Sequence, residues 1–277
     1  MQQYEPTLSL VGRLLLAVLF LWAGLHKILN PEGTQQYMAA YGLTLGTMLL
    51  YLAATVVEFA GGIALAVGHT TREAVFLLVL FMVMVTGIFH THLTDPNQVI
   101  QFAKNVAIIG GLFYVGAYGP GAHSMDAQDK VARYAGIAES HRAALTLAGR
   151  ICLGGLFLLS GLNKLLDPAG TRQYMVAMGM TPGTELFYAA AIVLELGGAL
   201  SLLLGWWTRV GAAALILFVT PATLIFHRTS MSFALDATVQ DQQFHVMKNL
   251  AIIGGLMYVL AYGGGPLSLD ARRRPDR

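Results

Sequence analysis

Two glutamates, Glu58 and Glu195, stand inside long apolar stretches of this chain. If these stretches are helices, each glutamate lies roughly 16 Å from the outer end of its stretch at 1.5 Å per residue. A carboxylate at that depth in a bilayer costs about 2.5–3.5 kcal/mol, so it must be paired, protonated or next to a water-filled cavity. Gly61 and Gly62 follow Glu58 by three and four residues and leave room on the same helix face for a helix or a ligand. Both glutamates are therefore candidate catalytic acid–base residues, and the alternative is a buried pair that only stabilises packing.

Four lysines and two asparagines are candidate ligand-binding residues near these acids. Lys104 and Lys248 begin near-identical segments, KNVAIIGGLFY and KNLAIIGGLMY, and lie roughly 9 Å inside a predicted helix. Each can extend to the membrane surface or bend towards the glutamate. Lys27 and Lys164 end an apolar run, where a lysine either anchors the helix or lines the same site. Asn105 and Asn249 follow the deeper lysines and either bind a ligand or form interhelical hydrogen bonds.

Two histidines, His90 and His227, end matching apolar runs and are the remaining catalytic candidates. A histidine in this place could relay protons to a quinone. Two axial ligands of a haem would have to face each other across a gap, which residues in separate halves do not favour. The alternative is an interfacial histidine that is hydrogen-bonded to a loop. No residue pattern predicts a metal site.

The composition places these residues in a membrane protein. Of 277 residues, 56% are hydrophobic and 12% are charged, against about 25% in an average soluble domain. The net charge of +2, without a basic stripe, excludes a nucleic-acid binder. A single cysteine, Cys152, excludes an internal disulfide, a CxxC pair and a cysteine-built iron–sulfur or zinc site.

Apolar runs of about 20 residues are long enough to cross a bilayer, and within lipid they must be helical. The sequence predicts eight, at residues 8–29, 47–67, 72–92, 99–118, 145–166, 184–204, 208–228 and 244–262. The expected partner of this surface is the lipid bilayer. An even number of spans places both termini on one side, and the excess of Lys and Arg on that side predicts cytoplasmic termini in an inner (plasma) membrane.

The chain contains the same unit twice. Residues 12–47 and 149–184 are identical at 21 of 36 positions. The match carries Glu58 onto Glu195 and His90 onto His227, and the Lys-Asn segments also recur. We therefore predict an all-α fold of two tandem four-helix bundles related by an axis along the membrane normal. Residues 1–118 form the first repeat, residues 119–144 a cytoplasmic linker, and residues 145–277 the second repeat with a basic C-terminal tail.

The repeated motifs resemble the DoxX/DoxD-like family of small four-helix bacterial membrane proteins. The matching features are an opening Gly-Arg, the GLxK segment followed by a polar residue and proline, the glutamate with paired glycines, the GxxTR turn and the KN…GG final span; in the first half these comprise Gly12, Arg13, Gly24, Lys27, Asn30, Pro31, Glu58, Gly61, Gly62, Gly68, Thr71, Arg72, Lys104, Asn105, Gly110 and Gly111. The resemblance covers nearly the whole chain, once per half, whereas the family's usual form has a single copy.

The resemblance implies the membrane subunit of a quinone-linked redox system, similar to thiosulfate:quinone oxidoreductase. Such a subunit would use a quinone, carry no covalent cofactor, and depend on a redox partner protein. As an enzyme it would be at most an oxidoreductase subunit without its own metal, haem or flavin. Two alternatives stay open, a small-solute or proton-coupled transporter and a membrane scaffold or assembly factor, and a homo-oligomer is a further expectation.

Overall fold

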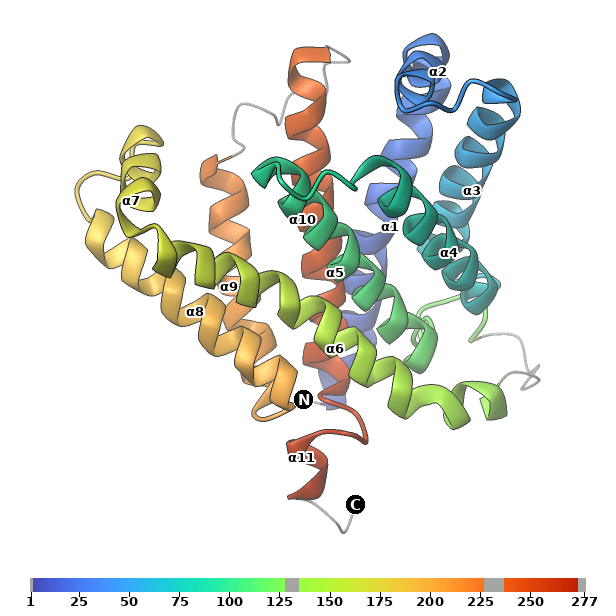
Figure 1. Cartoon of the computed structure of the whole chain (residues 1–277). Coiled ribbons are helices and arrows are strands. Elements are labelled where there is room, and N and C mark those ends of the chain that lie inside the picture. The colour runs from blue at the N-terminus through green and yellow to red at the C-terminus, as the bar shows by residue number, and fades with distance from the viewer. Residues whose placement is uncertain (1, 128–134, 227–236, 274–277) are drawn as a thin grey trace.

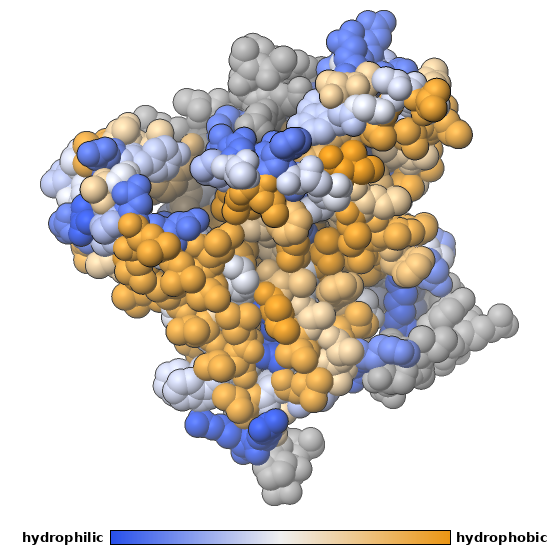
Figure 2. Space-filling model, in the orientation of Figure 1, coloured by the Kyte–Doolittle hydropathy of each residue, from blue (hydrophilic) through white to orange (hydrophobic). Residues whose placement is uncertain are grey.

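The computed structural model describes residues 2–127, 135–226 and 237–273. All regular elements in these residues are helical, which confirms the all-α prediction. Eight of the described helices are long and apolar enough to cross a membrane. They are α1 (Glu5–Leu29), α3 (Thr47–Val67), α4 (Thr71–Phe89), α5 (Pro96–Tyr118), α6 (Ala135–Leu166), α8 (Thr184–Leu204), α9 (Thr208–Phe226) and α10 (Ala237–Tyr262). Figure 2 shows a broad band of apolar side chains across one face, with hydrophilic side chains at both ends.

The remaining helices are short and lie outside this band. A 3-10 turn, η1 (Gln2–Tyr4), precedes α1, and α11 (Leu269–Arg272) follows α10. Helices α2 (Pro31–Ala40) and α7 (Pro168–Ala177) follow the first span of each half. Each begins with a proline after a capping side chain, because Asn30 accepts a hydrogen bond from the Gly33 amide and Asp167 from the Gly170 amide. Both termini lie at one end of the molecule and α2 and α7 at the other (Figure 1).

The two four-helix units are confirmed, and the structure shows how they are joined. In the first half α1 packs on α3, α3 on α4 and α4 on α5, and the second half repeats this order with α6, α8, α9 and α10. The most extensive contacts, however, connect the halves: α1 packs on α10, and α5 packs on α6. Helices α5 and α10 also cross at the centre (Figure 1). The first helix of each unit is therefore held chiefly by the last helix of the other.

Glycines allow this close contact between the halves. A Cβ atom added to Gly111 would lie 2.9 Å from the Cα atom of Gly255. A Cβ atom added to Gly12 would lie 2.8 Å from the Gly254 carbonyl oxygen. Since backbone atoms cannot move aside as a flexible side chain can, only glycine fits at these crossings. The Gly-Gly pairs of the final spans are thus packing faces.

Two arginines from the start of the repeat are buried structural residues. Arg13 is 1% exposed and donates hydrogen bonds to the carbonyl oxygens of Pro120 and His123, at 2.6 and 2.7 Å. Arg150 is 0% exposed and donates to the Leu202 carbonyl at 2.8 Å and to the Leu267 carbonyl at 2.5 Å. A guanidinium group offers five donors in a rigid fork, which suits it to hold several carbonyl groups. Each arginine thereby connects the first helix of its half to the segment after the last.

The segment after the last helix of each half also caps an inner helix. The Asp126 carboxylate accepts hydrogen bonds from the Thr70 and Thr71 amides, and Asp270 does the same for Trp207 and Thr208. Burial alone raises the pKa of Asp270, but the hydrogen bonds from Thr208 and Trp207 outweigh it and lower that pKa below its ordinary value. This repetition extends the first unit beyond residue 118. Helix α6 begins at Ala135, within the segment 119–144 that the sequence predicts as a linker.

Candidate functional site

The first candidate site is an ion pair between α1 and α3. The Nζ atom of Lys27 lies 2.6 Å from Oε2 of Glu58. The glutamate is buried, whereas the lysine side chain is 17% exposed. Among the described residues, Lys27 is the ionic partner of Glu58. A carboxyl group at this depth must be paired, protonated or next to a water-filled cavity, and in the structure Glu58 is paired.

Close helix packing and a tyrosine position this pair. A Cβ atom added to Gly62 would lie 3.0 Å from the Leu21 backbone nitrogen, and one added to Gly61 would lie 2.9 Å from the Leu78 side chain. The room that the sequence predicts beside Glu58 is therefore filled by α1 and α4. The Tyr51 hydroxyl group donates a hydrogen bond of 3.2 Å to the Lys27 carbonyl oxygen. It ties the end of α1 to the same face of α3 that carries Glu58.

The second half repeats the pair and adds a hydroxyl group. Lys164 Nζ lies 2.7 Å from Glu195 Oε2, with the lysine side chain 19% exposed. The Tyr188 hydroxyl donates to the Lys164 carbonyl oxygen at 3.0 Å, as Tyr51 does in the first half. In addition, Ser160 Oγ donates to Glu195 Oε1 at 2.7 Å and accepts from Lys164 Nζ at 2.9 Å. Ala23 occupies the corresponding place in the first half, so the two sites are not equivalent.

We expect Ser160→Ala to lower the free energy of unfolding by about 1.5–3 kcal/mol, because it removes hydrogen bonds to charged groups in a buried site. The reciprocal change, Ala23→Ser, introduces a hydroxyl group beside the Lys27–Glu58 pair. We expect it to raise the free energy of unfolding and so to offset the loss in Ser160→Ala. Equilibrium unfolding of both single variants and of the exchanged double variant measures these differences. Equal stability of wild type and Ser160→Ala would show that the hydroxyl group does not support the second pair.

The described contacts of the deeper lysines reach across to the other half and not to the glutamates, unlike the alternative in which each lysine bends towards the glutamate. Lys104 Nζ lies 3.0 Å from Nδ1 of His245, and Lys248 Nζ donates to Gln101 Oε1 at 2.6 Å. Gln101 Nε2 lies 3.0 Å from Nε2 of His245. All three contacts connect α5 with α10, so this group belongs to the interface between the halves. The physical reason is the crossing of α5 and α10, which turns both lysines towards each other's helix.

Gln101 and His245 are the site residues that the sequence analysis missed. They occupy corresponding positions in the two Lys-Asn segments, three residues before Lys104 and Lys248. Residues three apart share a helix face. This spacing could have indicated that each residue lies beside the following lysine. A comparison of the halves did not reveal it, because the first half has a glutamine where the second has a histidine.

The other predicted residues have local partners. His90 Nδ1 lies 2.8 Å from Gln98 Oε1, so this histidine contacts the start of α5. It is the C-cap residue of α4 and is not an ionic partner of Glu58. His227 lies outside the described residues. Asn105 and Asn249 each donate a 3.0 Å hydrogen bond to a threonine hydroxyl, Thr86 and Thr223, in the preceding span of their own half. Both asparagines therefore form interhelical hydrogen bonds, which is one of the two alternatives that the sequence predicts, the other being ligand binding.

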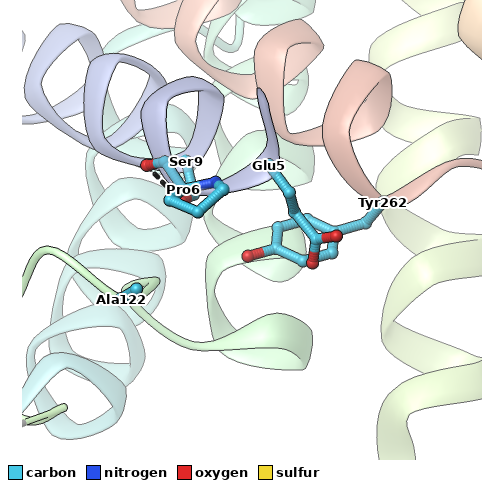
Figure 3. A pocket seen from close by; sticks show the side chains of 5 residues that line it. All are labelled: Glu5, Pro6, Ser9, Ala122 and Tyr262. Atoms are coloured by element: carbon cyan, nitrogen blue, oxygen red, sulfur yellow. Dashed lines mark hydrogen bonds between the residues drawn. The ribbon is translucent and has the colours of Figure 1, made fainter. Parts of the chain in front are cut away.

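No metal centre adjoins these residues in the part of the chain that the structure describes. No three His, Cys, Asp or Glu side chains within it converge as a metal site requires. A cavity of about 160 Å³ lies near the N-terminus, lined by Glu5, Pro6, Ser9, Ala122 and Tyr262 (Figure 3). None of the predicted site residues lines it. The candidates for chemistry that remain among the described residues are the two Lys–Glu pairs and the group between the halves.

Comparison with known proteins identifies relatives of both halves. The DoxX family profile matches residues 8–91 and again residues 145–228. Inner membrane protein YqjF of Escherichia coli (strain K12) is 36% identical over 126 residues, which cover 46% of this chain and 95% of YqjF. Inner membrane protein YphA of the same strain is 34% identical over 129 residues, 44% of this chain and 90% of YphA. The Surfeit locus protein 4 homolog of Schizosaccharomyces pombe is 23% identical over 280 residues, 99% of this chain and 84% of that protein. No solved structure matches.

Proposed function

Because this chain belongs to the DoxX family, with one copy of the family unit in each half, we propose that it is the membrane subunit of a quinone-linked redox system. The chain is a multipass membrane protein of that family. In the proposal, each Lys–Glu pair binds a quinone head group and exchanges protons with it. In the proposal, a partner protein supplies the electrons.

The observation that supports this proposal is the partly exposed ion pair inside each helical unit. A lysine ammonium group donates hydrogen bonds, as a quinone carbonyl oxygen requires, and the neighbouring carboxylate accepts protons. Lys27 Nζ lies 2.6 Å from Glu58 Oε2, so one pair offers both a hydrogen-bond donor and a base. The 17% and 19% exposed lysine side chains give a lipid-soluble ligand access to these groups. A bound quinone would supply the electron-accepting chemistry, and the chain's own residues would orient it and carry protons.

A photoreactive ubiquinone analogue tests the proposal on the full chain in lipid nanodiscs. We expect crosslinks to peptides of α1, α3, α6 and α8 that unlabelled ubiquinone competes away. In the double variant Glu58→Gln with Glu195→Gln, labelling of these peptides should fall to the level seen with excess competitor. The matched control is Glu73→Gln, because Glu73 is an exposed acid in the first turn of α4 and should leave labelling unchanged.

Undiminished labelling of these peptides in the folded double variant would contradict the proposal. If the double variant does not fold, each single variant is compared with Glu73→Gln, and one intact pair should retain its share of the crosslinks. The transporter and scaffold alternatives stay predictions. Solute-driven proton uptake by the isolated protein in proteoliposomes would favour transport over the redox role.

The proposal includes a location and an orientation. We place the protein in an inner membrane, as the names of the two E. coli relatives state for those proteins. The excess of Lys and Arg predicts that the end bearing both termini faces the cytoplasm. The Lys–Glu pairs then lie towards the opposite surface, where α1 and α6 end and α2 and α7 begin.

A further inference from the structure

The turn between α8 and α9 presents two exposed tryptophans, at the end of the molecule that carries α11 (Figure 1). Trp206 is 40% exposed and Trp207 is 63% exposed, and their ring centroids lie 5.4 Å apart. The turn joins two helices that are long and apolar enough to cross a membrane, so it lies where such helices leave the acyl chains. Tryptophan is enriched at that level, because its ring is apolar and its N–H group donates a hydrogen bond. This turn therefore faces lipid head groups.

Arginines lie beside these rings. The Cζ atom of Arg273 is placed over the Trp206 ring, 5.4 Å from its centroid. Arg272 ends the short helix α11 directly before it, and Arg274 and Arg277 follow in the sequence. A guanidinium group binds phosphate through two parallel hydrogen bonds and also stacks on aromatic rings. The contact with Trp206 thus holds a phosphate-binding group at the level of the lipid head groups.

The corresponding turn of the first half has the same backbone contacts. The Asp126 amide donates a hydrogen bond of 2.8 Å to the Gly68 carbonyl oxygen, and the Asp270 amide donates one of 2.8 Å to the Gly205 carbonyl oxygen. Both aspartates also cap the next helix through their carboxylates. Because the two halves share this framework, their side chains at this end can be compared position by position.

The side chains on the common framework differ in polarity and in charge. His69 and Thr70 stand in the first half where Trp206 and Trp207 stand in the second. At three further positions, the first half has Glu73, Gln128 and Asp129 and the second half has Val210, Arg272 and Arg273. Of these, residues 128 and 129 lie outside the described part of the chain and are compared by sequence alone. Two negative charges in the first half therefore correspond to two positive charges in the second.

We propose that Trp206, Trp207, Arg272 and Arg273 form a binding surface for anionic phospholipids, and that the first half lacks an equivalent surface. Charge complementarity selects this occupant, because a zwitterionic lipid carries an ammonium group that two arginines repel. Clusters of about four to eight basic residues next to a membrane-spanning helix attract anionic lipid in this way. The surface is independent of the proposed quinone role, since it lies at the opposite end of the helices from the Lys–Glu pairs.

Membrane orientation alone does not account for this arrangement. Positive charge at this end also helps to orient the helices, but arginines in either half would serve that purpose equally. A lipid site needs apolar contact with the acyl chains beside the positive charge. The second half provides it through the two tryptophans and through Leu267, which is 55% exposed and corresponds to His123 in the first half.

Quenching of tryptophan fluorescence by brominated lipids tests the surface on the full protein, in vesicles of phosphatidylcholine and phosphatidylglycerol. The phosphatidylglycerol is brominated in one sample, and an equal amount of the phosphatidylcholine is brominated in the other. Bromine quenches only nearby rings, so the comparison reports which lipid is enriched beside them. We expect a local excess of phosphatidylglycerol of about threefold or more, because each arginine near the surface attracts anionic lipid. Equal quenching by the two lipids would overturn the proposal.

The decisive variant is Arg272→Gln with Arg273→Gln, which keeps both tryptophans and removes the charges beside them. We expect it to abolish the excess quenching by phosphatidylglycerol. The control is Arg172→Gln, because Arg172 is an arginine of α7 at the other end of the molecule and should leave the excess unchanged. Persistence of the excess in the folded arginine variant would show that these arginines do not select the lipid.

Two further measurements locate the excess and do not depend on the arginine variant. In Trp206→Phe with Trp207→Phe, Trp22 of α1 is the remaining fluorophore, and we expect no excess quenching by phosphatidylglycerol. In the wild type, high salt should reduce the excess, because it screens the attraction between exposed charges. An excess that persists without the two tryptophans, or that is unchanged by salt, would contradict the proposal.

Discussion

Lys27→Met is expected to lower the free energy of unfolding by about 3–5 kcal/mol, because it leaves the buried Glu58 carboxylate without its ionic partner. The double variant Lys27→Met with Glu58→Met should regain most of this loss. Replacement of a buried ion pair by apolar side chains of similar volume is often neutral or stabilising, whereas removal of one partner is costly. Equilibrium unfolding of wild type, both single variants and the double variant gives the coupling energy of the pair.

Lys27→Arg is the matched control for this cycle, since it keeps a positive charge beside Glu58. We expect it to lose much less stability than Lys27→Met. The corresponding change in the second half, Lys164→Met, should cost less, because Ser160 still donates a hydrogen bond to Glu195. A loss below 1 kcal/mol in Lys27→Met would show that Glu58 does not depend on the lysine.

Gly111→Ala is expected to weaken the contact between the halves and to lower stability by about 1–3 kcal/mol. The added Cβ atom would lie 2.9 Å from the Cα atom of Gly255, so α5 and α10 would have to separate. Gly255→Ala should behave alike, because its Cβ atom would lie 2.8 Å from the Cα atom of Gly111. Resistance of the purified protein to unfolding by heat and by denaturing detergent measures the effect.

Gly116→Ala provides the matched control on the same helix. A Cβ atom there would lie 3.5 Å from the Val75 side chain, an ordinary contact distance. Since alanine favours a helix over glycine by about 1 kcal/mol, this variant should be unchanged or slightly more stable. If Gly111→Ala and Gly116→Ala were equally stable, the close crossing of α5 and α10 would not contribute to the fold.

The residues within one helix or one repeat were predictable because their information is local. Long apolar runs must be helical in lipid, and the repeated spacing of Lys27 and Glu58 indicated two copies of one unit. Helix α2 was not predicted, although Asn30 before Pro31 is a local capping signal. The expectation that a mid-span acid is paired, protonated or next to a water-filled cavity needed only the cost of a buried charge.

The choice of partner among several lysines was decided by the tertiary structure. The sequence places Lys27 and Lys104 within reach of Glu58 by depth alone, and depth does not distinguish them. Glycines bring α1 close to α3, so Glu58 forms its ion pair with Lys27. The crossing of α5 and α10 places Lys104 in contact with His245. The burial of Arg13 likewise depends on a carbonyl group more than a hundred positions away in the chain.

The sequence by itself therefore determined the class of protein, the helices, the duplication and the depth of the charged residues. Periodicity and the cost of charge in lipid act on single segments, so they can be read from one chain. Only the tertiary structure decided that the first helix of each half packs on the last helix of the other, and that the polar residues divide into two Lys–Glu pairs and one shared group. Those outcomes depend on how helices cross, and the crossings follow from glycine contacts between segments far apart in the sequence.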